Sequence, residues 1–166
     1  MKKILIALIT CLTLLIPSQG FAASTPSSQV TISGPKGQKL TVSQTKGLKK
    51  DSKVTVTGSG YDMEIGIYAT FCVIPKKGAK PDHCGAYNIT GINSQAVWIS
   101  SNPPLYAALL VTGFKKGGKF KIELPLSLKI GDKDCRKVKC AVLTRADHTN
   151  GDNRTADVIV PIAFSK

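Results

Sequence analysis

Two cysteines near the carboxyl end of the chain are the residues whose chemistry most restricts this protein. Cys135 and Cys140 have four residues between them, three of which are cationic. The spacing could belong to a metal site, a redox pair or a disulfide. Common zinc sites need four ligands, arranged in pairs roughly two to four residues apart, and His83 and His148 form no second pair. A redox pair usually has about two intervening residues near a βαβ unit, and the sequence has neither. A disulfide that closes a tight loop fits best.

The beginning of the chain predicts export. Lys2 and Lys3 precede an uncharged apolar run over residues 4–16, which has the length of a signal-peptide core and is too short to span a bilayer. Small residues at positions 20 and 22 favour cleavage after Ala22. We therefore expect a signal peptide over 1–22, a flexible stub over 23–29 and a single domain over 30–166. The expected location is extracellular, with cell-wall association as an option.

Removal of the signal peptide would leave an even number of cysteines, namely Cys72, Cys84, Cys135 and Cys140. An even number in an exported chain indicates two disulfides. Three pairings are open in principle. We favour Cys72–Cys84 and Cys135–Cys140, because each pair bounds a short polar loop.

The charge balance indicates anionic surroundings. The formal net charge is +13, and the loss of Lys2 and Lys3 would leave +11. Such a surface suits cell-wall polymers, acidic polysaccharide, lipid headgroups or DNA by charge alone. The lysines are scattered and no nucleic-acid motif accompanies them, so a basic secreted monomer without such a partner remains the simpler alternative.

The sequence offers no catalytic arrangement that would support an enzyme. There is no G-x-S-x-G elbow, no phosphate-cradling loop and no nucleotide fingerprint. Asp147, His148 and Asp152 could suggest a metal or an acid–base pair, but a polar loop between two strands explains them equally well. We expect a protein that is not an enzyme and that has no metal and no cofactor.

Hydrophobic periodicity of two predicts the fold. Apolar and polar residues alternate in short runs that Gly, Pro, Asn and Asp clusters separate; the seven expected strands are residues 30–33, 40–43, 53–57, 66–73, 120–124, 138–144 and 158–164. We predict an all-β protein: an immunoglobulin-like, seven-stranded antiparallel β-sandwich with two local disulfides. Residues 86–110 are less regular. They contain Trp98, which is either an exposed ligand platform or a buried core residue.

Several phrases resemble the neocarzinostatin family of secreted chromophore-carrying apoproteins. A Cys-x4-Cys loop runs into an apolar strand, and a polar turn and the ending "DVIVPIAF" follow. The opening "LTVSQTKGLKKDSKVTVTGSGYD" and the strand "GIYATFC" are also similar to that family. "WISSNPP" and "TRADHT" resemble secreted actinobacterial proteins of this fold that have no established ligand. The resemblance covers roughly residues 30–164 and is weakest over 87–119.

The resemblance implies an open cleft for a small apolar or aromatic ligand. In the family this ligand is an enediyne chromophore, an antibiotic whose released form, not the protein, attacks DNA. The matching cleft positions are Tyr68, Thr70 and Cys72 on one strand, Cys84 opposite them, and Ala141, Leu143 and Arg145 on a second strand. Ile74 stands where the family prototype has an aromatic residue, and Trp98 completes the candidate ligand-binding set.

Three alternatives stay open at this level. The cleft could instead be filled by residues 86–110 packing on Tyr68 and Leu143. Because this chain is basic whereas the family prototypes are acidic, the cleft could also bind something anionic. The protein could also be a basic cell-envelope interaction domain that holds no small molecule.

Overall fold

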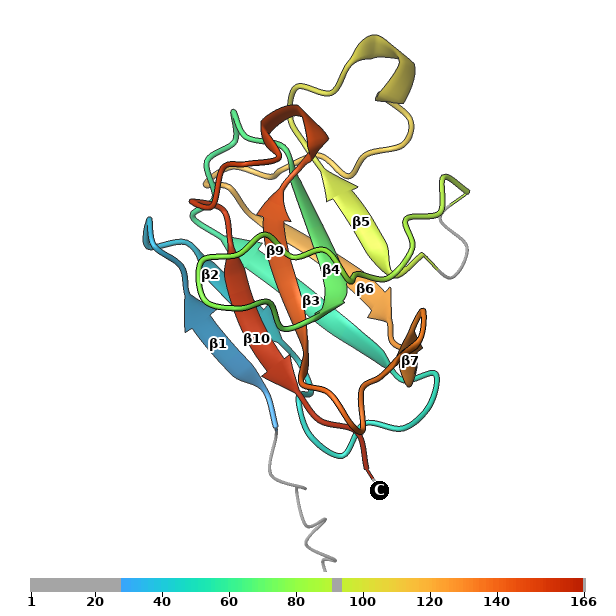
Figure 1. Ribbon diagram of the computed structural model, residues 1–166. Helices are drawn as coiled ribbons and strands as arrows, with labels where there is room; N and C mark the ends of the chain where they lie inside the picture. Colours follow the sequence, from blue (N-terminus) through green and yellow to red (C-terminus); the bar gives the residue numbers. More distant parts are fainter. Residues whose placement is uncertain (1–27, 91–93, 166) are drawn as a thin grey trace, which may run out of the picture.

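The computed structural model describes residues 28–90 and 94–165. Two four-stranded antiparallel sheets pack face to face (Figure 1). The first sheet contains, in spatial order, β1 (Val30–Ser33), β2 (Lys39–Val42), β3 (Lys53–Ser59) and β6 (Phe120–Pro125). The second contains β10 (Val158–Ile162), β9 (Cys140–Ala146), β4 (Ile67–Val73) and β5 (Ala96–Ile99).

The remaining regular elements are short. A hairpin joins β7 (Lys129–Ile130) to β8 (Lys133–Asp134). Two 3-10 turns, η1 (Leu105–Ala107) and η2 (His148–Asn150), follow β5 and β9. Disulfides join Cys72 to Cys84 and Cys135 to Cys140. The predicted all-β, immunoglobulin-like antiparallel sandwich with two local disulfides is therefore confirmed, and its two main sheets have four strands each.

The expected signal peptide and most of the expected stub lie outside the described residues. Within the described part of the chain, no helix has the length and apolar character needed to cross a bilayer.

The core lies between the two sheets, as the alternating sequences require. Buried and solvent-facing residues alternate along β3 and β6, because successive side chains of a strand point to opposite faces. Buried side chains from both sheets meet there, among them Leu40, Val56, Phe71, Leu124 and Val142. By contrast, β4 and β9 are buried on both faces, so something must also cover the outer side of the second sheet.

The cover is the chain that follows β4, which we call the cover segment, residues 74–86. It passes in front of β9 and β10 in Figure 1. The Cys72–Cys84 disulfide and a hydrogen bond of 2.9 Å from the Val73 N–H to the His83 carbonyl return it to β4. An ion pair of 3.6 Å between Lys80 Nζ and Asp152 Oδ1 ties it to the β9–β10 turn.

The strand β5 was not among the predicted strands. All four residues of its sequence AVWI are apolar, so apolar and polar residues do not alternate. Ala96, Trp98 and Ile99 are buried in the structure. The turn cluster at residues 102–104 bounds it on one side only. A strand buried on both faces cannot be recognised from periodicity alone.

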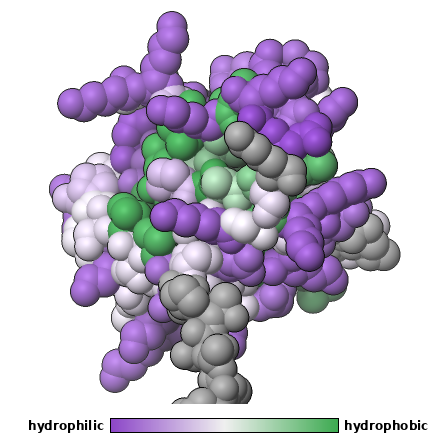
Figure 2. Space-filling view, turned by 90° about the horizontal axis from the view of Figure 1, so that it is seen from below, coloured by the Kyte–Doolittle hydropathy of each residue, from purple (hydrophilic) through white to green (hydrophobic). Residues whose placement is uncertain are grey.

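Two lysine-bearing loops lie near the end of the sandwich from which the carboxyl terminus leaves. Figure 2 views this end and shows an apolar centre within a hydrophilic rim. Val138 and Phe164 pack there against the core and remain partly exposed. The β2–β3 and β8–β9 connections contribute exposed cations, which we call the lysine rim: Lys46, Lys49, Lys50, Lys137 and Lys139. Among the described residues, no carboxylate forms an ion pair with any of these five lysines.

Candidate ligand-binding site

Strand register brings most of the predicted site residues together on the outer face of the second sheet. Tyr68 on β4 lies between Arg145 on β9 and Trp98 on β5. One row further along β4, Thr70 lies opposite Leu143. The third row pairs Cys72 with Ala141. The alternating neighbours of these residues form the sandwich core, so the seven side chains point to the same outer face.

Only part of this face is open. A surface pocket of about 330 Å³ is lined by Tyr68, Thr70, Asp82, Cys84, Gly85, Tyr87, Ala96, Arg145 and His148. Four of the nine predicted ligand-binding residues therefore line it: Tyr68, Thr70, Cys84 and Arg145. The other five do not line it.

The predicted residues that do not line the pocket are mostly buried. Cys72, Ala141 and Leu143 have no exposed surface, and Ile74 is half-buried at the start of the cover segment. Trp98 is 4% exposed and lies beside Tyr68 on the neighbouring strand β5. The sheet face is thus filled toward Ala141 and open toward Tyr68.

Aromatic rings form one wall of the pocket, with Tyr68 at the centre. Its ring centroid is 6.0 Å from those of Tyr87 and Trp98 and 6.2 Å from that of His148. The Trp98 and His148 rings meet edge to face at 4.9 Å. These separations lie within the range in which aromatic rings attract one another. A flat ring entering the pocket would find further rings to pack against.

Hydrogen bonds to Asp147 connect this wall to the neighbouring strand and turn. The residue is 2% exposed. Its carboxylate accepts hydrogen bonds from Trp98 Nε1 at 2.9 Å, the Thr149 N–H at 2.9 Å and Thr149 Oγ1 at 2.6 Å. These bonds begin η2 and so position His148, whose Nδ1 lies 2.8 Å from the Tyr68 hydroxyl. Although burial raises the pKa of Asp147, the hydrogen bonds from Thr149 and Trp98 outweigh it and lower the pKa overall.

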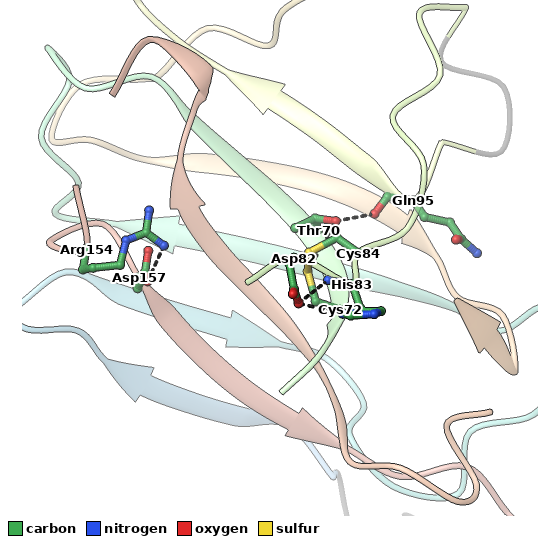
Figure 3. The surroundings of a disulfide bond; sticks show 8 residues. All are labelled: Thr70, Cys72, Asp82, His83, Cys84, Gln95, Arg154 and Asp157. Atoms are coloured by element: carbon green, nitrogen blue, oxygen red, sulfur yellow. Dashed lines mark hydrogen bonds and ion pairs between the residues drawn. A yellow bond between two sulfur atoms is a disulfide. The ribbon is translucent and has the colours of Figure 1, made fainter. Parts of the chain in front are cut away.

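The floor of the pocket depends on the disulfide between Cys72 and Cys84. Figure 3 shows Thr70 beside this bond, with its hydroxyl donating to the Gln95 carbonyl at 3.0 Å. At the pocket mouth Asp82 accepts a hydrogen bond of 2.7 Å from the His83 N–H, and its carboxylate lies 2.7 Å from His83 Nδ1.

Arg145 gives the pocket its cationic side. The Arg145 Cζ atom lies 5.4 Å from the centroid of the Tyr68 ring, within the distance of a cation–π contact. Burial raises the pKa of Tyr68, and the negative charge of Asp147 adds to this effect against the opposing charge of Arg145. The Tyr68 hydroxyl therefore stays protonated at neutral pH and can donate a hydrogen bond.

The described residues contain no group of three or more His, Cys, Asp or Glu side chains that could hold a metal ion. The pocket offers stacking, hydrogen bonding and the positive charge of Arg145, with the Asp82 carboxylate at its mouth. These properties suit the binding of an aromatic molecule.

Two other pockets of about 410 Å³ each lie elsewhere. One is near Tyr61 and Gln38. The other lies between the β5 and β6 edges and is lined by Ile89, Leu109 and Trp98, among others. We favour the smaller Tyr68 pocket, because three rings, those of Tyr68, Tyr87 and His148, line it together with Arg145, and a few placed polar groups among apolar walls are typical of small-molecule sites.

Sequence reasoning did not include Tyr87 and His148 in the ligand-binding set. Both belong to irregular segments, where periodicity gives no facing direction. The only signal was the "TRADHT" phrase, in which Arg145 and His148 are three residues apart and the chain leaves a strand.

Comparison with known proteins supports the fold. The sequence matches no family model and no curated protein. Among solved structures, the chain is similar to macromomycin, a protein of the neocarzinostatin family, with a TM-score of 0.51 and 16% sequence identity. The similarity covers 77% of this chain and 99% of macromomycin. At this identity the likeness concerns the architecture: a small antiparallel β-sandwich.

Proposed function

We propose that this protein is a secreted, non-enzymatic carrier of the neocarzinostatin type that holds a small apolar or aromatic molecule in the Tyr68 pocket. The observation that carries the proposal is the convergence of Tyr68, Tyr87 and His148 around a pocket of about 330 Å³. This pocket lies on the sheet face where the family resemblance implies a cleft. The similarity of the fold to macromomycin supports the same assignment.

The proposal assigns the protein no cofactor and no nucleic-acid recognition of its own. In the family that the sequence resembles, DNA-directed antibacterial action comes from the ligand. A role in antibiosis would therefore depend on which molecule the pocket holds.

Trp98 provides the test, because it is the only tryptophan in the chain and its ring packs against Tyr68 and His148. We expect a member of a panel of aromatic compounds to change its fluorescence and to raise the melting temperature. Tyr68→Ala should weaken that binding about tenfold or more, because it removes the central ring. Leu109→Ala, which alters the β5–β6 pocket, serves as the control and should leave the affinity unchanged. If no compound in the panel gives a response, the proposal fails.

A second candidate function rests on the lysine rim. Its five cations have no carboxylate partner in the described part of the chain. The end of the sandwich seen in Figure 2 has an apolar centre within a hydrophilic rim. Such a surface suits an anionic cell-envelope polymer. Binding to isolated cell wall that weakens steeply with added salt would support this function, since exposed charge contacts are screened.

A further inference from the structure

Arg145 has an unused hydrogen-bonding group at the pocket. Its Nε atom is buried and has no hydrogen-bond partner in the structure. Buried polar groups in native proteins nearly always have a partner, and each exception needs an explanation. Here the guanidinium lines the pocket and lies over the Tyr68 ring. In the described part of the chain no carboxylate forms an ion pair with this guanidinium.

The nearby carboxylates have other hydrogen-bond donors. Asp147 accepts three hydrogen bonds from Trp98 and Thr149. Asp82, at the pocket mouth, is paired with His83 at 2.7 Å.

Asp157 accepts a hydrogen bond from Arg154 Nη1 through Oδ2 at 3.1 Å (Figure 3). Its other oxygen, Oδ1, is buried and has no hydrogen-bond partner among the residues that the structure describes. Burial raises the pKa of Asp157 despite the opposing charges of Arg154 and Arg145. Among the described residues, no direct ion pair joins Asp157 to Arg145.

We propose that the ligand of this pocket is an aromatic anion whose carboxylate, sulfonate or phenolate group is bound by Arg145. The inference rests on the proposed binding function and specifies its ligand class. Arginine suits this role because its planar fork of N–H donors matches an oxyanion. The Tyr68 hydroxyl and the His148 ring lie on the same side of the pocket and can add a further donor. The rings of Tyr68 and Tyr87 would pack against the aromatic part.

Two fluorescent probes that share one ring skeleton, and differ only in an anionic group, measure the contribution of that group to binding. The anionic probe is 8-anilinonaphthalene-1-sulfonate, and the neutral probe is N-phenyl-1-naphthylamine. We expect wild-type protein to bind the anionic probe about tenfold more tightly, the range expected for one charge-assisted contact. Arg145→Gln should abolish this preference and leave the affinity for the neutral probe within about twofold. Arg145→Lys should keep part of the preference.

Arg136→Gln is the matched control, because it removes the same charge from the exposed Cys135–Cys140 loop. It should leave the preference intact. Equal binding of the two probes by wild-type protein would overturn the anion assignment while the proposed binding function stands. A preference that survives Arg145→Gln would place the anion on surface lysines and would also overturn it. If neither probe binds and Trp98 fluorescence responds to no aromatic compound, the binding function itself fails. If Arg145→Gln does not fold, the wild-type comparison can still overturn the assignment, and an undiminished preference in Arg145→Lys would contradict it as well.

Discussion

Asp147 is the residue through which the pocket wall is joined to the sheet. It is almost fully buried, yet its carboxylate has three donors. A buried charge is tolerated when hydrogen bonds replace the lost water. This one connects β5, through Trp98, to the turn that carries His148.

We predict that Asp147→Asn lowers the free energy of unfolding at pH 7 by about 1–3 kcal/mol, because an amide cannot accept from every donor. The folded pKa of Asp147 lies below its ordinary value of 3.8. The stabilisation is therefore complete above pH 3.8 and is lost as the pH falls through the folded pKa. Urea unfolding of both proteins at several pH values should show the difference between them shrinking below about pH 4. Asp157, whose pKa is raised, has the opposite pH trend but is present in both proteins, so it cancels in the comparison. A difference that is constant from pH 7 to pH 3 would contradict this account.

The backbone at Gly66, just before β4, lies so close to the Asp147 carboxylate that there is no room for a side chain. A Cβ atom at Gly66 would overlap Asp147 Oδ2 and would lie 3.4 Å from Ser100 Oγ. Overpacking of this kind typically costs about 1–3 kcal/mol. We predict that Gly66→Ala lowers the melting temperature, whereas Gly113→Ala, where a Cβ atom meets no other atom within 4 Å, does not. Equal melting temperatures for the two variants would show that the approach is not restrictive.

At the scale of the elements, the two disulfides have different tasks. Cys72–Cys84 spans 12 residues and holds the cover segment on the sheet. Cys135–Cys140 spans 5 residues and closes the loop that precedes β9. Longer loops lose more entropy when they are closed, so the first bond should contribute more to stability.

We predict that the Cys72→Ser, Cys84→Ser double variant loses about 3 kcal/mol, and the Cys135→Ser, Cys140→Ser variant about 2 kcal/mol. Only the first should also lose ligand affinity, because Cys84 lines the pocket. Denaturant unfolding and probe binding, measured on both variants, give the comparison. Equal losses of affinity would argue that the Cys72–Cys84 bond has no special role at the site.

Strand periodicity was sufficient for much of the fold, because β3, β6 and β9 alternate or carry long apolar runs. It also placed Tyr68 and Arg145 on defined faces of their strands. It could not show that the two residues are neighbours, since that depends on the register between β4 and β9. It could not recognise β5, where burial on both faces removes the alternation. Nor could it include Tyr87 and His148, which irregular segments bring to the pocket.

In the molecule as a whole, the lysine rim and the Tyr68 pocket lie on different parts of the surface. The lysine rim lies near one end of the sandwich, whereas the Tyr68 pocket opens on the outer face of the second sheet. The two features can therefore be altered separately, and they correspond to the two candidate functions.

We predict that replacing the five rim lysines, Lys46, Lys49, Lys50, Lys137 and Lys139, by Gln lowers the salt concentration at which the protein leaves an immobilised polyanion. The control replaces five other exposed lysines, Lys76, Lys77, Lys115, Lys116 and Lys121, and changes the net charge equally. An equal effect of the two variants would mean that net charge alone governs the binding, without a specific surface. Neither variant should alter binding at the Tyr68 pocket.

The central claim is that the Tyr68 pocket is a binding site for an aromatic molecule. The most direct measurement is a titration of isotope-labelled protein with an aromatic probe, followed by amide chemical shifts in NMR spectra. The account predicts saturable shifts that centre on Tyr68, Thr70, Tyr87, Arg145 and His148. Shifts centred on Ile89 and Leu109 at the β5–β6 pocket, or no saturable shifts with any probe, would contradict it.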